Sequence, residues 1–184
     1  QLAKGHQAYI VCPAIEGSGD ESIRSVKEYY EKTAVPLLPG RRVGLMHGKL
    51  RPAEKNSVMD AFKQGELDVL VSTTVIEVGM DVPNATVMVI ENAERFGLSA
   101  LHQLRGRVGR GSAESCCILL SDHQSESVQQ RLRFLCHTND GFAVAKYDLE
   151  TRGPGDFFGQ AQHGLPKLQI ADLMADTRPL AAAQ

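Results

Sequence analysis

The chain lacks the features that mark membrane, secreted and metal-binding proteins. No apolar run approaches the roughly 20 residues that a membrane-spanning helix needs, and no basic and apolar leader pattern opens the sequence. The four cysteines show no Cys-x-x-Cys spacing, and the six histidines form no His-Glu-x-x-His pattern. We therefore expect a cytosolic protein without a metal site. The cysteines, which we expect as buried thiols in strands, are Cys12, Cys116, Cys117 and Cys136.

A phosphate-binding loop of the form Gly-x-x-x-x-Gly-Lys-Ser/Thr is also missing, as is a strand that ends in paired acidic residues. These elements hold the β- and γ-phosphates of a nucleotide and place Mg²⁺. The net charge of −2 gives no global attraction to nucleic acid, so any such binding must come from local clusters. The chain starts at Gln1 and its first methionine is Met46, which leads us to expect a piece of a longer protein.

Short apolar runs rich in β-forming residues alternate with helical patterns along most of the chain. Strands are predicted at 7–13, 42–46, 69–71, 86–90 and 115–120, and helices at 23–34 and 52–64. This alternation predicts an α/β fold: a mostly parallel sheet with helices on both faces and functional loops at the carboxyl ends of its strands. Helical patterns at 126–136 and 142–150, followed by a glycine-rich segment, predict a helical hairpin and an extended loop.

The segment QLRGRVGRG, residues 103–111, sets three arginines among glycines. Glycine disfavours a helix, so Gly106 and Gly109 within a helical stretch indicate close approach of another group to the backbone. Arg107 and Arg110, three residues apart, would project from one face of that helix. Their rigid donor forks suit phosphate oxygens, which favours a polyphosphate ligand over the alternative of a solvated basic patch.

Four segments are expected to converge on one edge of the sheet, and together they resemble the second RecA-like domain of a superfamily 2 helicase. They are His47–Gly48, Ser72–Thr74, Gly79–Asp81 and Gln103–Arg110. The resemblance implies a P-loop NTPase-type fold in which the nucleotide lies between two RecA-like domains.

The same resemblance implies roles for individual residues. Arg107 and Arg110 become arginine fingers for the γ-phosphate, and Gln103 helps to orient their helix at the cleft. Gly79 and Asp81 become nucleotide-side residues, although taken alone they would form a plain turn.

The resemblance also implies phosphate contacts with nucleic acid. His47, Gly48, Ser72, Thr73 and Thr74 fall at positions where helicases bind DNA or couple it to the motor. Such contacts carry no base-sequence information. The alternative is that the hydroxyl residues simply end a strand.

Beyond superfamily level, ENAERFGLSALHQLRGRVGRG, SCCILL and DLETRGPGDFFGQAQHG resemble the bacterial RecG family of fork-reversing DNA translocases, from about Val11 to Pro166. The resemblance implies that Arg131 and Arg152 latch the two hairpin helices and that Gln162 lies in the loop that works against DNA. The alternatives are a solvated helix face for Arg131 and a charge at a helix carboxyl end for Arg152. The loop departs from the family pattern at two residues, Ala161 and His163.

The RecG resemblance implies the carboxyl-terminal half of an ATP-dependent DNA helicase that remodels stalled forks and Holliday junctions. Residues 1–122 would form the second motor domain, and residues 123–184 the hairpin and coupling loop. The first RecA-like domain would bind most of ATP and Mg²⁺, so the isolated chain is expected to be inactive. Expected partners are branched double-stranded DNA, that first domain, a DNA-binding wedge and single-strand-binding protein, with no membrane.

We expect a cytoplasmic, nucleoid-associated monomer of bacterial origin. Two alternatives remain from the residues alone. One is the matching region of the transcription-repair coupling factor Mfd, and the other is a non-enzymatic nucleic-acid-binding module whose arginines form an electrostatic patch.

Overall fold

The computed structural model describes residues 1–13, 25–73 and 82–152 of the chain. The chain divides into two compact units, Gln1–Ala145 and Lys146–Gln184. In the second unit the described residues are helical, and Thr151 Oγ1 donates to the carbonyl of Tyr147 at 2.7 Å. The first unit holds the sheet and everything discussed below. The expected division at residues 122 and 123 stays a prediction.

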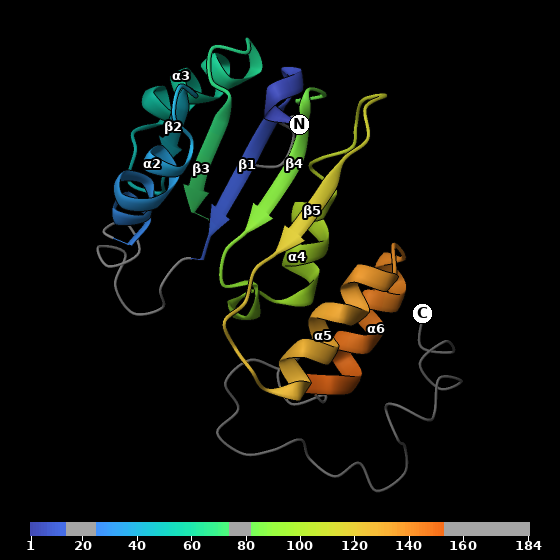
Figure 1. The fold of residues 1–184 in the computed structure, drawn as a ribbon. Coiled ribbons are helices and arrows are strands. Elements are labelled where there is room, and N and C mark those ends of the chain that lie inside the picture. The colour runs from blue at the N-terminus through green and yellow to red at the C-terminus, as the bar shows by residue number, and fades with distance from the viewer. Residues whose placement is uncertain (14–24, 74–81, 153–184) are drawn as a thin grey trace, which may run out of the picture. The chain divides into compact units, whose positions relative to one another are not determined.

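Five parallel strands form the centre of the first unit (Figure 1). They are β1 (Gln7–Cys12), β2 (Val43–Met46), β3 (Val69–Thr73), β4 (Ala85–Ile90) and β5 (Cys116–Leu119), in the spatial order β2-β3-β1-β4-β5. In the central strand, Ile10 pairs with Val71 on one side and with Val89 on the other. The predicted strands and the parallel arrangement are confirmed.

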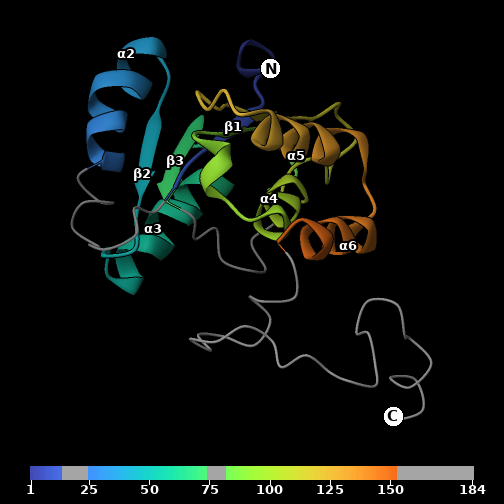
Figure 2. The same cartoon turned by 90° about the horizontal axis from the view of Figure 1, so that it is seen from below.

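Helices cover both faces of the sheet, which explains why the strand sequences are apolar without alternation. On one face, Val26 and Ala34 pack with Ile10. These two residues belong to a helical stretch whose described part runs from Ser25 through the π-helical η2 (Tyr30–Ala34) and α2 (Val35–Leu37). On the other face, Phe62 of α3 (Pro52–Lys63) packs against Tyr9 with its ring tilted by 54°, and the ring centroids are 4.9 Å apart. Figure 2 shows α2 and α3 on opposite sides of the strands.

The predicted helices after the sheet are present. Helix α5 (Glu126–His137) begins at Ser125, whose hydroxyl accepts a hydrogen bond from the Val128 amide at 3.4 Å. A connection of residues 138–140 leads into α6 (Gly141–Arg152). There the Asp140 carboxylate accepts from the Phe142 amide at 2.8 Å. The extended loop expected after the hairpin lies outside the described residues.

The arginine segment is helical only as far as Arg105, in contrast to the prediction that Arg107 and Arg110 also lie on the helix. Helix α4 (Leu98–Arg105) ends where Gly106 begins, and the Arg107 amide then donates to the Leu104 carbonyl at 2.9 Å in a tight turn. Gly109 follows with a φ of +79°. Glycine readily adopts this left-handed backbone, and it commonly terminates helices for that reason. Arg107 and Arg110 therefore lie beyond the helix instead of on one of its faces.

The expected convergence of all four segments on one edge of the sheet is also wrong. Helix α4 connects two parallel strands, so it must run back toward the amino ends of the strands. The connection after α4 reaches that opposite edge (Figure 1). There, a Cβ built on Gly111 would lie 2.8 Å from the Pro83 carbonyl oxygen, just before β4. Gln1, which precedes β1, donates to the Glu114 carbonyl at 3.3 Å.

Only part of the cysteine prediction is correct. Cys12 is buried in β1, and burial raises the pKa of its thiol to about 12. Cys116 is exposed, because β5 is an edge strand with a partly exposed face. Cys136 is exposed and lies on α5, not in a strand.

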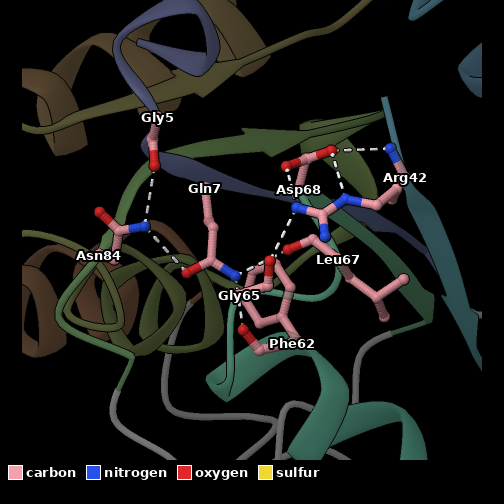
Figure 3. A network of polar contacts seen from close by, with 8 residues as sticks. All are labelled: Gly5, Gln7, Arg42, Phe62, Gly65, Leu67, Asp68 and Asn84. Atoms are coloured by element: carbon pink, nitrogen blue, oxygen red, sulfur yellow. Dashed lines mark hydrogen bonds and ion pairs between the residues drawn. The ribbon is translucent and has the colours of Figure 1, made fainter. Parts of the chain in front are cut away.

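A polar network that the sequence did not reveal fastens the amino ends of the strands (Figure 3). The buried amide of Gln7 donates to the carbonyls of Phe62 and Leu67, at 2.5 and 2.8 Å. Its oxygen accepts from the Asn84 amide at 3.1 Å, and Asn84 also donates to the Gly5 carbonyl at 3.0 Å. One glutamine thus joins β1 to the end of α3 and to the start of β4.

Arg42 and Asp68 extend this network toward the edge strand β2 (Figure 3). The guanidinium donates to both carboxylate oxygens, at 2.8 and 3.2 Å, and the Arg42 amide adds a bond of 2.8 Å. The same side chain donates to the Gly65 carbonyl at 2.7 Å. These hydrogen bonds hold the pKa of the Asp68 carboxyl below its usual range. Because Arg42 precedes β2 and Asp68 precedes β3, the pair fixes the start of this strand pairing.

Candidate nucleotide and DNA faces

The arginine segment forms an ordered turn at the amino edge of the sheet. Arg110 Nε donates to the Gly106 carbonyl at 3.0 Å, which holds that side chain across the turn. Arg107 is half-buried, and its guanidinium makes no hydrogen bond or ion pair with any residue in the described ranges. A half-buried guanidinium without a protein partner is suited to a phosphate ligand.

Two glycines hold this turn close to its surroundings. A Cβ on Gly109 would lie 2.5 Å from Ser115 Oγ, and one on Gly111 would lie 2.8 Å from the Pro83 carbonyl oxygen. The sequence analysis singled out Gly109 for close approach, and this contact has that character. The contact with Pro83 brings the arginine segment beside the residues that follow Gly79 and Asp81. Those two residues themselves lie outside the described ranges.

Gln103 lies on α4 with its side chain exposed. His102 and Arg105 of the same helix contact the α5–α6 connection instead. Helix α4 therefore presents different residues to solvent and to the helices that follow it.

The carboxyl edge of the sheet carries the residues expected to bind DNA phosphates. His47 follows β2 and is 8% exposed. Burial lowers the pKa of its imidazole, and the nearby charges of Lys27 and Lys55 lower it further. Gly48 is exposed, and a Cβ there would meet no atom within 4 Å. This corner is open and carries lysines that can attract an anion.

Ser72 and Thr73 end β3 and are buried. The Ser72 hydroxyl is fully enclosed and has no hydrogen-bond partner within the described part of the chain. In this conformation Ser72 belongs to the core, and a phosphate has no access to its side chain. Thr74 lies outside the described residues.

Arg131 and Arg105 hold α5 against α4 and the segment that precedes α4. From α5, Arg131 donates to the carbonyls of Glu94 and Phe96, at 2.6 and 3.2 Å. Both acceptors lie close to the start of α4, the first of them within the 3₁₀ turn η3 (Ala93–Arg95). From the end of α4, Arg105 donates in turn to the main chain of α5. Arg105 was expected only as part of the group of three arginines, because nothing in its spacing indicates this contact.

The expected latch between Arg131 and Arg152 stays a prediction, because the side chain of Arg152 lies outside the described part. Gln162 lies outside it as well. Within the described ranges, no three His, Cys, Asp or Glu side chains group so that they could hold a metal ion. In the same ranges, no helix has the length and apolar character to span a membrane.

The comparison with known proteins agrees with this geometry. Residues 1–112, which hold the first four strands and the arginine segment, match the family described as helicase conserved C-terminal domain. The chain belongs to this family. Residues 138–184 match the family described as ATP-dependent DNA helicase RecG, domain 3, C-terminal. The helicase domain is thus followed by a segment typical of RecG, as the sequence motifs indicated.

Two RecG proteins are similar to this chain along all or nearly all of its length. ATP-dependent DNA helicase RecG of Bacillus subtilis is 50% identical over 184 residues, which is all of this chain and 27% of that protein. RecG of Thermotoga maritima is 53% identical over 180 residues, 98% of this chain and 23% of that protein. The chain spans about a quarter of the length of these relatives.

Solved structures support the helicase-domain fold. A structure of RecG bound to a three-way DNA junction matches with a TM-score of 0.73 and 50% identity, over 97% of this chain and 22% of that one. S. cerevisiae Dbp5 bound to RNA and ADP BeF3 matches with a TM-score of 0.53 and 20% identity, over 79% of this chain and 38% of that one. At that identity, the second match bears on the fold alone.

Proposed function

We propose that this chain is the second motor domain, with the coupling hairpin, of an ATP-dependent DNA helicase that remodels branched DNA. One observation carries the proposal. An arginine turn at one edge of a RecA-like sheet is joined through α4 to a helix that precedes a RecG-type segment. Identity of 50% to RecG extends along the entire chain, and one RecG structure contains a three-way DNA junction.

The nucleotide face is the arginine turn. Arg107 and Arg110 supply guanidinium donors, and Gln103 lies on the helix that leads into the turn. ATP and Mg²⁺ would be held mainly by the first RecA-like domain, and the bound nucleotide supplies the phosphoryl group whose transfer drives movement. Gly79 and Asp81 are proposed for the same face, because the residues after them contact Gly111. Donors on a preformed turn stabilise the developing charge without reorganisation.

The DNA face is the carboxyl edge of the sheet. His47, Gly48, Thr73 and Thr74 are proposed to lie along the phosphate backbone. Ser72 can join them only after the end of β3 changes conformation, because its hydroxyl is enclosed. The two faces then occupy opposite edges of one sheet, so that a rigid movement of the sheet carries both.

The coupling element is proposed to consist of Arg131, Arg152 and Gln162. Arg131 supports this role through its two bonds to the motor main chain. Further proposed partners are the first RecA-like domain, a DNA-binding wedge and single-strand-binding protein. We propose a monomer that acts in the bacterial cytoplasm at the nucleoid.

The proposal is favoured over a coupling factor of the Mfd type by the match of residues 138–184 to the RecG-specific region. It is tested with the full-length parent protein by DNA-stimulated ATP hydrolysis and by strand separation on forked and linear duplex DNA. Alanine variants at Arg131, Arg152 and Gln162 are compared with wild type and with Arg133→Ala, an exposed position on α5. We expect the three variants to hydrolyse ATP but to fail on forks. If wild type shows neither DNA-stimulated hydrolysis nor fork remodelling, the proposed function is wrong.

A further inference from the structure

Arg105 lies on the side of α4 that faces α5, and the resemblance to RecG assigns this residue no role. Arg105 Nη1 donates to the carbonyls of Leu135 and Thr138, at 2.8 and 2.7 Å. Leu135 lies in the last turn of α5, and Thr138 is the first residue after that helix. One guanidinium nitrogen therefore holds the carboxyl end of α5 and the connection that leads to α6.

This contact supplies hydrogen bonds to main-chain carbonyls at the carboxyl end of α5. The last carbonyls of a helix have no partner within it, and they carry the negative end of the helix dipole. A positive donor placed there satisfies two acceptors and also opposes the dipole. Because both acceptors are main-chain atoms, the contact fixes the backbone of α5 itself and not a mobile side chain.

His102 extends the contact one turn earlier on α4. Its ring nitrogen Nε2 lies 3.3 Å from the Asn139 carbonyl oxygen. A Cβ built on Gly141, the first residue of α6, would lie 3.2 Å from His102 Cε1. His102 and Arg105 are three residues apart on the helix, so they face the same way. Together they hold the connection between α5 and α6 against α4.

The connection between α5 and α6 lies beside a cavity. A cavity of about 590 Å³ borders Arg105 and is also lined by Gly106, Val108 and Leu135. The turn that carries the arginines thus forms one wall of this space, and the end of α5 forms another. Movement of either wall is not blocked by a packed core.

We propose that Arg105, assisted by His102, is a positioning residue that transmits displacement of the arginine turn to the start of α6. Arg105 precedes Arg107 by two residues, so a shift of the turn toward a nucleotide moves the Arg105 guanidinium with it. The carbonyls of Leu135 and Thr138 then follow, while Arg131 holds α5 nearer its middle. This inference rests on the proposed function and adds to it the link between nucleotide and hairpin.

The test uses the full-length protein with Arg105→Ala and Arg105→Lys, and with Arg133→Ala as the control on an exposed face of α5. Three quantities are measured: DNA-stimulated ATP turnover, base pairs of forked DNA separated per ATP, and hydrogen exchange of amides 141–145 with and without a non-hydrolysable ATP analogue. Lysine keeps the charge but cannot reproduce the planar fork, so Arg105→Lys is the milder change if alanine impairs folding.

We expect Arg105→Ala to keep ATP turnover within about threefold of wild type and to lower separation per ATP about tenfold, within the range that coupling mutations produce. We expect Arg105→Lys to fall between wild type and alanine. The analogue should change exchange at 141–145 in wild type and in Arg133→Ala, and this change should vanish in Arg105→Ala.

Other outcomes overturn the inference. If both Arg105 variants lose turnover and separation in the same proportion, Arg105 is a structural brace and not a link. An unchanged response of amides 141–145 in Arg105→Ala has the same meaning. If wild type itself fails to hydrolyse ATP with DNA, the failure belongs to the proposed function and not to Arg105.

Discussion

Gln7 illustrates how much a single polar residue contributes where strands begin. It is buried, and its side-chain amide makes three hydrogen bonds that join β1 to α3, to the loop before β3 and to Asn84. In the sequence Gln7 merely starts an apolar strand, because no local pattern indicates which distant carbonyls will come within reach. Residue roles that depend on the assembled sheet are therefore invisible until the strand order is known.

Replacement of Gln7 by leucine should destabilise the chain strongly. It leaves the Leu67 carbonyl and one Asn84 N–H without the Gln7 side chain and removes one of the two hydrogen bonds of the Phe62 carbonyl, which also accepts from the Gly65 amide at 3.1 Å. This loss costs about 2–4 kcal/mol in the free energy of unfolding. Urea unfolding of the 184-residue chain measures the loss. Gln124→Leu, at an exposed position, should stay within about 0.5 kcal/mol of wild type. A Gln7→Leu chain as stable as this control would contradict the role of the network.

Asp68 gives the same network a dependence on pH. Its folded pKa is lowered by the bonds from Arg42, so its contribution is present above the unfolded pKa of about 3.9 and is lost as pH falls through the folded value. We expect Asp68→Asn to lower the free energy of unfolding by about 1 kcal/mol at pH 7. The difference from wild type should shrink steadily as the pH is lowered below about 4.

Urea unfolding at a series of pH values measures this difference. Asp60→Asn, which replaces an exposed carboxylate on α3, serves as the control. If the difference in the free energy of unfolding between Asp68→Asn and wild type is the same at pH 3 as at pH 7, the ion pair with Arg42 does not cause that difference.

At the scale of elements, the sequence predicted correctly which segments form strands and helices. It did not predict where α4 ends. All five strands and the helices after the sheet fall where apolar periodicity places them, because that periodicity reflects burial directly. Helix α4 ends at Arg105, so Arg107 and Arg110 lie beyond the helix on which they were expected, because the two glycines permit a tight turn and a left-handed residue. The expected convergence of the arginines with His47 on one edge of the sheet was also wrong. A crossover helix between parallel strands must return to their amino edge, and this separates the arginines from His47.

The shape of the arginine turn can be tested at Gly109. Alanine there must adopt a φ of +79° and would place its Cβ 2.5 Å from Ser115 Oγ, so the Ser115 hydroxyl or the turn must shift. In the full-length protein we expect DNA-stimulated ATP turnover to fall about tenfold while DNA affinity is retained, since misplaced catalytic donors lose rate more than binding.

Gly40→Ala is the matched control. Gly40 has a similar φ of +75° but no atom within 4 Å of the new Cβ, so this variant shares the backbone strain without the displacement. Turnover that falls equally in both variants would attribute the effect to general destabilisation instead of the arginine turn.

At the scale of the whole molecule, the proposed function makes this chain one half of a two-domain motor. The chain has the arginine turn and the sheet edge proposed to face DNA, but the sequence has no phosphate-binding loop. The family could be recognised from sequence because its glycine and arginine motifs are local in the chain. The contacts of Arg105 and Arg131 with main-chain carbonyls could not be predicted from the sequence, because every residue has a carbonyl that can accept such a bond.

The central claim is that Arg110 and Arg107 act on a nucleotide held by another domain, and Arg110→Lys in the full-length protein tests it most directly. ATP turnover with forked DNA and the affinity for that DNA are measured together, beside Arg133→Ala. An arginine finger is worth about 10³ to 10⁵ in rate, and a lysine cannot present its fork, so turnover should fall at least about 100-fold while DNA affinity stays unchanged. Retained turnover with lost DNA affinity would contradict the account and leave the arginines as an electrostatic patch.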